Sequence, residues 1–567
     1  MKYTLTTAIA AMMLAAPCAM AEDIDTKIAI ERQVVPEHRS ASRLNLLPEL
    51  QLPAVKQMRL NPSDRISSIT IPAYMTTLDP ASYATAADPY PWRGYAAIGY
   101  FPAFNLGASA GYRILDRTAT TLDAWLQYNG ASWHGDLPAD IAGDSDPKLG
   151  LHSHTATIGA ALTQRFGSRS ALTFGLDYTY ANWNAPDLTY NDGVEAFNHH
   201  LNRLNFNAGW QSRTSDRFAY HAALGYGLMA FGLPDPDDVM PSENTGKLNL
   251  GLDWNFAGKW HLLTDIDGDV NIYNTPDKAF AKGNAALRPR VMWNNGKFAA
   301  TLGLDLDIYF QNGTHYYNGE THGYIYPRIN LAWTPSGSFT IWGQISGKTY
   351  NNSYAELYDW CRYVRPIAET PWSKTIDFEG GITLGPWRGA ALELFGGFSA
   401  AGSWITPYAF EGEPWQGSIM MPDIHGAHYG MKLSYRYRSL LEIRGKIEGA
   451  AHSDDDMESG WYRWRDRARW DIDVALDLNP IKPLTITLGH NWRTGRRCTT
   501  FGDSFSDVFY TTLGNVSSLR IAAAYRITDA LSVFARGENI LNHRHYIMPG
   551  IPAQGVAGLV GITYKLP

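Results

Sequence analysis

Hydrophobic and polar residues alternate one by one through much of the chain, and residues 467–492 show this pattern most clearly. Even positions carry Trp, Ile, Val and Leu, and odd positions carry the charged residues Arg469, Asp471, Asp473 and Asp477. Successive side chains of a strand point to opposite faces, so a period of two indicates β-structure. Two prolines interrupt the alternation, which indicates a turn, and the following residues alternate in the same way. The segment therefore predicts a hairpin with one apolar face and one polar face.

The same alternation recurs from residue 94 nearly to the end of the chain, and it predicts about 22 strands of roughly 9 to 14 residues each. Examples are 103–115, 155–165, 171–183, 218–230, 299–310, 325–333, 373–384, 428–437, 441–450, 517–527 and 554–566. Ordinary globular strands average about five or six residues. Strands that cross a membrane in a barrel need about 9 to 11 residues, because they are tilted. The strand length therefore favours a membrane barrel.

The connections between these strands alternate between short and long. The short ones use the Gly, Asn and Pro residues of hairpin turns, at 165–169, 294–297, 334–337, 386–389, 437–439 and 479–483. The long ones are polar, at 135–153, 184–200, 232–246, 350–372, 405–425, 452–466 and 494–514. Bacterial outer-membrane barrels have tight periplasmic turns and large outer loops. A soluble sandwich or propeller has no reason to place its long loops on one side.

The composition agrees with this class. Charged residues make up 18% of the chain, below the roughly 25% of average soluble domains, and aromatic residues make up 13%. No run of 18 apolar residues follows the N-terminal 21 residues, so the sequence predicts no membrane-spanning helix. We predict an all-β fold, a transmembrane antiparallel β-barrel of about 22 strands in the outer membrane of a Gram-negative bacterium.

The charged face of the predicted strands must point into the lumen, because a charge facing lipid costs several kcal/mol. The predicted lumen-facing charges are Glu442, Arg444, Lys446, Glu448, Arg469, Asp471, Asp473 and Asp477. The apolar rows 470–478 and 484–492 have equal lengths, so we expect Trp470 and Trp492 at one height, at the outer interface. Nine residues at about 3.3 Å each, tilted by about 45°, span roughly 21 Å, close to the apolar band of such barrels.

The N-terminus has the features of a secretory signal peptide. Lys2 is followed by an apolar stretch, and Ala19 and Ala21 form a small-x-small cleavage site before Glu22. Residues 1–21 are therefore excluded from the fold. Residues 22–93 are rich in proline and show little periodicity. They could fold back into the lumen, dock a periplasmic partner as extended Pro-rich segments do, or form a disordered leader.

The end of the chain resembles the last hairpin of TonB-dependent receptors. The family pattern at the end of the penultimate strand is matched by Asn539, Leu541, Asn542 and Tyr546, with one extra residue before the tyrosine, and a Gly-rich final strand follows. The resemblance covers residues 94–567 and implies the family's 22-stranded barrel and its outer-membrane location. The family also carries a plug of well over a hundred residues and a TonB-pairing segment. Residues 22–93 are too short for that plug, and coupling to TonB is not implied.

Other candidate sites are weak. The acidic loop clusters lack the spacing of a calcium loop, and no histidine or cysteine group has the spacing of a metal site, so we predict no metal and no cofactor. Cys361 and Cys498 are candidates for a disulfide in an oxidising compartment. His490 lies on the lipid-facing row, where a serine at the same height would complete a Ser–His pair. The sequence does not identify that serine, and we predict no enzyme.

Aromatic residues are frequent in the long outer loops, and Trp360, Trp415, Trp461 and Trp464 are candidates for ligand contact. Loop packing over the barrel mouth would use the same residues, so both alternatives stay open. The predicted function is transport or ligand recognition across the outer membrane. The alternative is a structural subunit of a larger outer-membrane complex. The predicted partners are outer-membrane lipid and other membrane or periplasmic proteins that dock on residues 22–93, with no nucleic acid.

Overall fold

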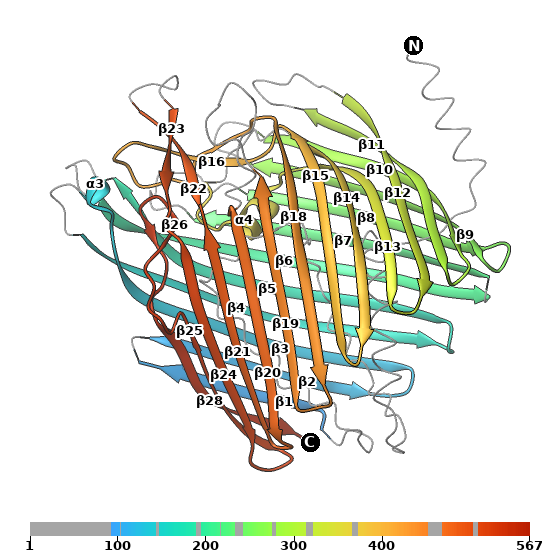
Figure 1. The fold of residues 1–567 in the computed structure, drawn as a ribbon, viewed down its shortest axis with the longest axis horizontal. Helices are drawn as coiled ribbons and strands as arrows, with labels where there is room; N and C mark the ends of the chain where they lie inside the picture. Colours follow the sequence, from blue (N-terminus) through green and yellow to red (C-terminus); the bar gives the residue numbers. More distant parts are fainter. Residues whose placement is uncertain are drawn as a thin grey trace.

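The structure is a computed structural model, and it describes residues 92–567 except 103, 143–146, 189–193, 216, 233–241, 275–278, 313–320, 366–371, 452–467 and 503–507. Its main body is a closed barrel of 22 strands (Figure 1). The strands are β1 (Gly94–Phe101), β2 (Asn105–Asp116), β3 (Thr120–Asp136), β4 (Lys148–Phe166), β5 (Ser170–Leu188), β6 (Val194–Ser215), β7 (Phe218–Gly232), β8 (Ser242–Asn255), β9 (Trp260–Asn274), β10 (Ala279–Asn294), β11 (Phe298–Asn312), β12 (Thr321–Ser336), β13 (Phe339–Tyr350), β14 (Ser373–Trp387), β15 (Ala390–Gly402), β18 (Ile424–Tyr437), β19 (Leu441–Ala451), β20 (Trp470–Ile481), β21 (Leu484–Thr494), β24 (Val516–Arg526), β25 (Leu531–Glu538) and β28 (Ala557–Leu566).

Every strand of the barrel pairs antiparallel with its neighbours, and the two ends of the chain close the ring. The closing pair is β1 with β28, with Ile98 opposite Ile562. The predicted fold class and the predicted number of strands are therefore confirmed. Within the described part of the chain, no helix has the length and apolar character needed to cross a membrane.

The two faces of the strands differ as the alternation predicts. On β9, Ile266, Val270 and Ile272 are 39 to 46% exposed and form the outer, lipid-facing row. The alternate residues of the same strand point inward, and Tyr273 is only 1% exposed. Aromatic side chains gather at the periplasmic end, where the rings of Trp260 and Trp293 lie 5.9 Å apart. Such belts mark the interface between lipid and water.

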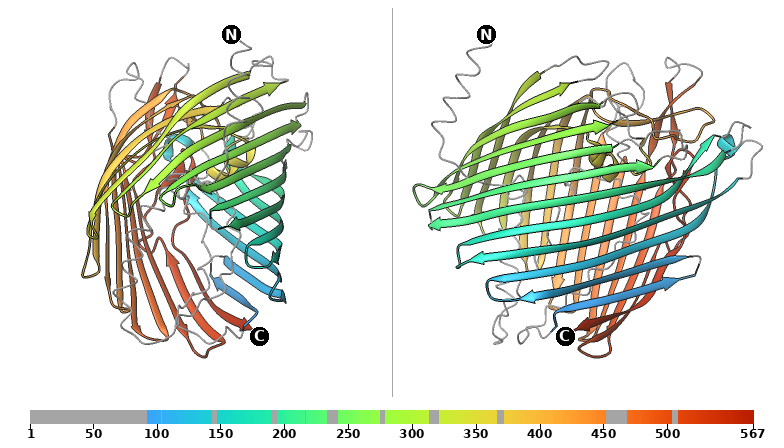
Figure 2. Two further views of the ribbon diagram at one scale, coloured as in Figure 1. Left: turned by 90° about the vertical axis from the view of Figure 1, so that its right-hand side faces the viewer. Right: turned by 180° about the vertical axis from the view of Figure 1, so that it is seen from behind.

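Strands β3 to β6 are much longer than a membrane crossing requires, and β6 reaches 22 residues. Residues 135–136, 148–153, 184–188 and 194–200, which were predicted to lie in loops, are strand in the structure, so that prediction was wrong in extent. The reason is that backbone pairing continues above the membrane wherever the neighbouring strand continues with it (Figure 2). Polar residues at the outer ends of these strands led us to expect loops.

The hairpin of β20 and β21 has a register that the sequence did not predict. Trp492 lies opposite Ile472, and Trp470 lies opposite Thr494, so the two tryptophans are not at one height. The strand β20 continues through an irregularity to Ile481, and the turn is shorter than expected. The shift is two residues, so each side chain keeps the face that the alternation assigns to it.

The remaining elements lie at the outer end of the barrel. A four-stranded sheet joins two long connections and contains β17 (Ile419–Met420), β16 (Thr406–Phe410), β22 (Arg497–Phe501) and β23 (Val508–Thr512). The others are α3 (Ala139–Ala142), α4 (Tyr354–Trp360), β26 (Tyr546–Met548) and β27 (Ile551–Pro552). The helix α4 belongs to the connection between β13 and β14 and lies inside the barrel near its mouth (Figure 2).

Candidate functional site

The mouth of the barrel contains a hydrophobic core built from outer connections and the inner wall. We call this set of side chains the mouth core. Its loop members include Tyr354, Leu357 and Trp360 of α4, Trp415, and Met548 of β26, all 4% exposed or less. Its wall members come from β5, β6, β7, β9 and β10, namely Ala181, Trp183, Leu201, Met229, Phe231, Tyr273 and Phe280. Parts of three outer connections, between β13 and β14, β15 and β18, and β25 and β28, therefore fold inward over the lumen, where they are packed like a domain interior.

Two buried wall residues hold the start of α4. Lys282 of β10 is 1% exposed, and its Nζ donates to the backbone oxygens of Asn351 at 2.6 Å and Asn352 at 3.1 Å. Glu243 of β8 is also 1% exposed, and its carboxylate accepts from the backbone N–H of Tyr354 at 2.6 Å. Such charged side chains satisfy the open backbone groups that precede and begin a helix. Ser353 and Glu356 form the capping box of α4, and the wall residues add contacts that attach the start of the helix to the barrel.

Three arginine contacts hold α4 and the residues after it. Arg203 of β6 donates to Asp359 of α4 at 2.9 Å. Arg362 is buried, donates to Ser153 of β4 at 2.6 Å and lies 5.7 Å from the ring of Trp183. Arg365 donates to Asp187 of β5 at 2.8 Å. Together with Lys282 and Glu243, these contacts attach the connection to an arc of the wall from β4 to β10.

The four candidate tryptophans have different outcomes. Trp360 is 2% exposed and Trp415 is 1% exposed, and both belong to the mouth core. For these two residues the structure shows packing in the mouth core, and ligand contact after a movement of the connection stays a prediction. Trp461 and Trp464 lie outside the described residues.

Seven of the predicted lumen-facing charges lie on β19 and β20, on the strand face opposite to that of the exposed Val474. They form ion pairs along β19, across the ladder between β19 and β20, and with arginines of nearby strands. The pairs are Arg436–Glu442, Arg444–Asp477, Lys446–Glu448, Arg493–Asp471 and Arg520–Asp473. Arg469 precedes β20, and its backbone N–H donates to Thr494 at 2.8 Å. This part of the wall is charged with both signs and has no single electrostatic preference.

A second charged arc lies on the inner face of β9 to β12, and it is far more buried. Arg328 donates to Asp305 at 2.6 Å, with side-chain exposures of 5% and 2%. Arg290 pairs with Asp265 at 2.9 Å, and Arg288 lies between Asp267 and Asp305. Alternation places Asp305 in the lumen, but the arginines of β10 and β12 meet it only through the register. This cluster was not predicted from the sequence.

The two cysteines do not form the candidate disulfide. Cys361 and Cys498 are both free and buried. Cys361 ends α4, and Cys498 lies in β22, where its Sγ donates to the backbone oxygen of Pro407 at 3.6 Å. Burial raises the pKa of the Cys361 thiol to about 12, so the reactive thiolate is scarce at neutral pH.

We expect Cys361 and Cys498 to be unreactive toward a maleimide in the folded barrel. Both thiols should be labelled after heating in detergent without a reductant, because burial alone protects them. Mass spectrometry of the labelled chain counts the added groups. Labelling that requires a reductant would show that the disulfide forms after all.

The C-terminal motif shapes the outer end of the last hairpin. Asn539 and Asn542 have positive φ angles of 47° and 48°, a conformation that asparagine tolerates better than most residues. The Asn539 side chain donates to the backbone oxygen of Gln554 at 3.2 Å, and the Asn542 side chain accepts from the N–H of Val556 at 3.3 Å. Leu541 is 57% exposed, and Tyr546 starts β26. The motif thus fixes the return of the chain toward β28.

The structure supplies the serine that the sequence could not identify beside His490. The Nε2 atom of His490 lies 3.1 Å from Oγ of Ser517, and both side chains are on the outer face of β21 and β24. Nucleophilic catalysis also requires a group that orients the imidazole and donors for an oxyanion. The described residues place neither beside this pair, and the strand N–H groups around it belong to the ladder. We interpret the pair as a mutual hydrogen bond at the membrane interface.

The N-terminal predictions concern residues that the structure does not describe. These are the signal cleavage residues Ala19, Ala21 and Glu22, and nearly all of the segment 22–93. The first described strand begins at Gly94. The roles suggested for residues 22–93 stay predictions.

The fold defines a class, the 22-stranded outer-membrane barrel, here with three of its described outer connections packed in the mouth. Solved structures with this fold confirm the resemblance to TonB-dependent receptors at the level of the barrel. The FrpB iron transporter of Neisseria meningitidis has a TM-score of 0.64 at 12% identity, covering 84% of this chain and 81% of that chain. The ferric enterobactin receptor PfeA of Pseudomonas aeruginosa, solved with enterobactin, has the same TM-score, identity and coverage.

A third structure, the siderophore receptor PirA of Acinetobacter baumannii, has a TM-score of 0.62 at 10% identity, covering 84% of this chain and 80% of that chain. No family model matches the sequence, and no curated protein matches it. At these identities the comparisons establish the fold, and the ligand must be argued separately.

Proposed function

We propose that this protein recognises a ligand at the cell surface and admits it through the outer membrane. The observation that carries the proposal is the mouth, where α4 is held inside the barrel by side chains of the inner wall. Access from outside is then controlled by a connection that must move. Three structurally similar proteins are an iron transporter, a ferric enterobactin receptor and a siderophore receptor, so ferric siderophores are the first ligands to test.

The test is a titration of the full mature chain in detergent with a panel of ferric siderophores, followed by quenching of tryptophan fluorescence. We expect saturable binding of at least one complex. In a variant whose residues 351–365 are replaced by a Gly-Ser linker, the affinity of the barrel for that complex should change at least tenfold. The control is Lys482→Ala, in the exposed periplasmic turn. A folded barrel that binds no complex would contradict the proposed ligand class.

A second function, that of a structural subunit, is favoured by the packing of the mouth core. A mouth packed as tightly as a domain interior also suits a barrel that opens rarely or never. Under this proposal, residues 22–93 dock a partner in the periplasm. An affinity pull-down from outer membranes in mild detergent should then recover a stoichiometric partner that is lost when residues 22–93 are deleted. A barrel that comes away alone would argue against this function.

A further inference from the structure

The outer rim of the barrel is lowest at β1 and β2. The strand β2 pairs with β3 only as far as the pair Asn105–Ala131, whereas β3 continues to Asp136. On the other side, β1 pairs with β28 only as far as the pair Tyr100–Val560. The connection between β25 and β28 crosses this low point, and its Pro552 oxygen accepts from the indole N–H of Trp133 at 3.3 Å. A seam therefore runs between the outer part of β3 and residues 552–556.

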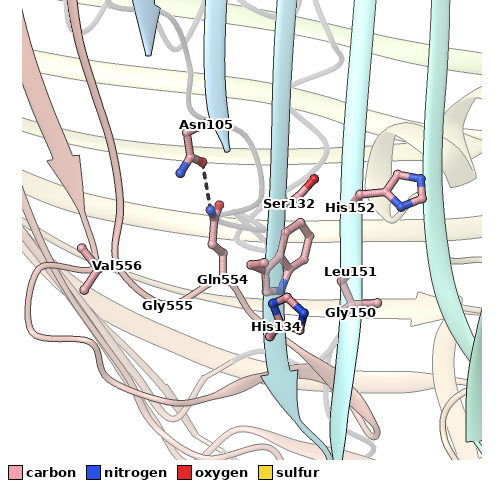
Figure 3. Close-up of a pocket in the computed structure, with 10 residues that line it drawn as sticks. Asn105, Ser132, His134, Gly150, Leu151, His152, Gln554, Gly555 and Val556 are labelled. Atoms are coloured by element: carbon pink, nitrogen blue, oxygen red, sulfur yellow. Dashed lines mark hydrogen bonds between the residues drawn. The ribbon is translucent and has the colours of Figure 1, made fainter. Parts of the chain in front are cut away.

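This seam contains a cavity of about 470 Å³ (Figure 3). Its floor includes Asn105, whose side-chain oxygen accepts from the amide of Gln554 at 2.9 Å. Ser132, His134 and His152 line the side formed by β3 and β4. These three residues share the outer face with Leu126 and Ile158, which are 47% and 56% exposed. The cavity thus lies at the rim of the barrel wall, with Ser132, His134 and His152 on its outer side and with Asn105, Trp133 and Leu151 on its inner side.

The polar groups in the cavity are oriented by contacts of their own. The Asn539 side chain holds the backbone of Gln554, and the Gln554 amide reaches Asn105. The Nε2 atom of His152 lies 2.7 Å from the amide oxygen of Asn182 on β5. The C-terminal motif therefore positions one side of the cavity, and the outer face of β5 orients the other. Such second contacts fix a side chain for binding before a ligand arrives.

The chemistry of the lining favours a neutral, polyhydroxylated ligand. The polar side chains are carboxamides, a hydroxyl and imidazoles, each of which can donate or accept. The ten described lining residues include no Asp, Glu, Lys or Arg. A phosphate or a carboxylate would need cationic partners, and a hard cation would need several carboxylate oxygens. A sugar ring needs mixed donors and acceptors beside an apolar surface, and Val556 provides such a surface at 43% exposure.

The height of the cavity on the wall places it next to lipid headgroups. Phe166, at the periplasmic end of β4, is 50% exposed and marks the lower interface. The fourteen-residue separation from Phe166 to His152 corresponds to roughly 46 Å along the strand, or about 33 Å of height at a tilt of about 45°. The apolar band of such barrels is about 25 Å tall. The cavity therefore lies about 8 Å above the acyl chains, at the level of headgroup sugars.

We propose that this seam cavity is a lateral binding site for a sugar ring, supplied by the headgroup of an outer-leaflet glycolipid or by a free saccharide of the same chemistry. The site is separate from the mouth, so the inference goes beyond the proposed function and does not depend on it. The ligand would stabilise the place where the wall has its shortest strands. The side chains that would bind the sugar are those of Ser132, His134, His152 and Gln554.

The test uses the full mature chain, extracted in mild detergent and examined by native mass spectrometry for retained lipopolysaccharide. Two variants address the cavity: His134→Ala removes an exposed polar group, and Ser132→Trp fills the space. Each should reduce retention at least fivefold relative to the unmodified barrel. The control is His200→Ala, on the outer face of β6 at the height of His154 and outside the cavity. Gel mobility before and after heating shows that each variant is folded.

A second arm identifies the source of the sugar. The delipidated barrel is titrated with the soluble core oligosaccharide of lipopolysaccharide, and binding is measured by calorimetry. Binding that Ser132→Trp abolishes would support the cavity and assign it to free saccharides as well as lipid. Retention of lipopolysaccharide that depends on the cavity, without binding of the oligosaccharide, would assign it to the membrane-bound glycolipid. Equal retention in both variants and the control, with no oligosaccharide binding, would overturn the proposal.

Discussion

Replacing Lys282 by methionine is expected to release α4 from the mouth of the barrel. The change removes both hydrogen bonds to the Asn351 and Asn352 oxygens, and it leaves the buried carboxylate of Glu243 near α4 without this cation. Removing one partner from a buried charged contact costs about 3 to 5 kcal/mol. A cost of about 3 kcal/mol raises the population of the open connection roughly a hundredfold, since 1.4 kcal/mol is a factor of ten.

Two measurements check this release. Hydrogen exchange of the amides in residues 354–361 should become roughly a hundred times faster. Single channels in a planar bilayer should open more often than those of the unmodified barrel. The matched control is Lys446→Met, because Lys446 is 49% exposed on the inner wall and lies outside the mouth core. Unchanged exchange in a folded Lys282→Met barrel would show that α4 is held by packing alone.

The second large effect concerns the buried ion pairs of β9 to β12. Arg328→Met leaves Asp305 buried beside Arg288 but without its closest partner. We expect the free energy of unfolding to fall by about 3 to 5 kcal/mol. Unfolding in urea, followed by the gel mobility of the barrel, measures this change. The expected loss is large because water does not screen a pair at 5% and 2% exposure.

Two further variants separate burial from charge. The double variant Arg328→Met with Asp305→Leu should recover most of the lost stability, because it leaves no unpaired charge in the arc. Arg444→Met breaks an ion pair in which the arginine is 57% exposed, and it should cost about 1 kcal/mol or less. Equal losses for Arg328→Met and Arg444→Met would contradict the role of burial.

The alternation of apolar and polar residues was enough to predict the strands of the barrel wall and the two faces of each strand. The alternation around Asp471 and Asp473 defines two faces, and it does so without knowledge of any partner strand. The register is different, because it depends on how the chain passes its turns. The strand β20 extends to Ile481, and Trp492 therefore pairs with Ile472, two residues away from the expected partner Trp470. A two-residue error preserves the face, so the prediction of which side meets lipid did not suffer.

The contents of the mouth could not be predicted in the same way. The contacts of Lys282 with Asn351, and of Glu243 with Tyr354, join residues that are distant in the sequence and unrelated by any period. In the sequence, Trp360 and Trp415 are aromatic residues within long polar connections. They become buried only because these connections meet in the folded barrel. The seam cavity has the same origin, because it unites the first strands with residues near the C-terminus.

The pairing of β1 with β28 has a consequence for the order of assembly. This pairing spans only residues 94–100 on β1, whereas β5 and β6 pair along the whole of Ser170–Leu188. The two strands of the closing pair are also separated by nearly the whole described chain, so the loop-closure entropy of joining them is the largest in the barrel. Hairpins that form locally pay much less of this entropy and fold sooner. The ring is therefore expected to close last during insertion, and to open first when the barrel is pulled apart or denatured.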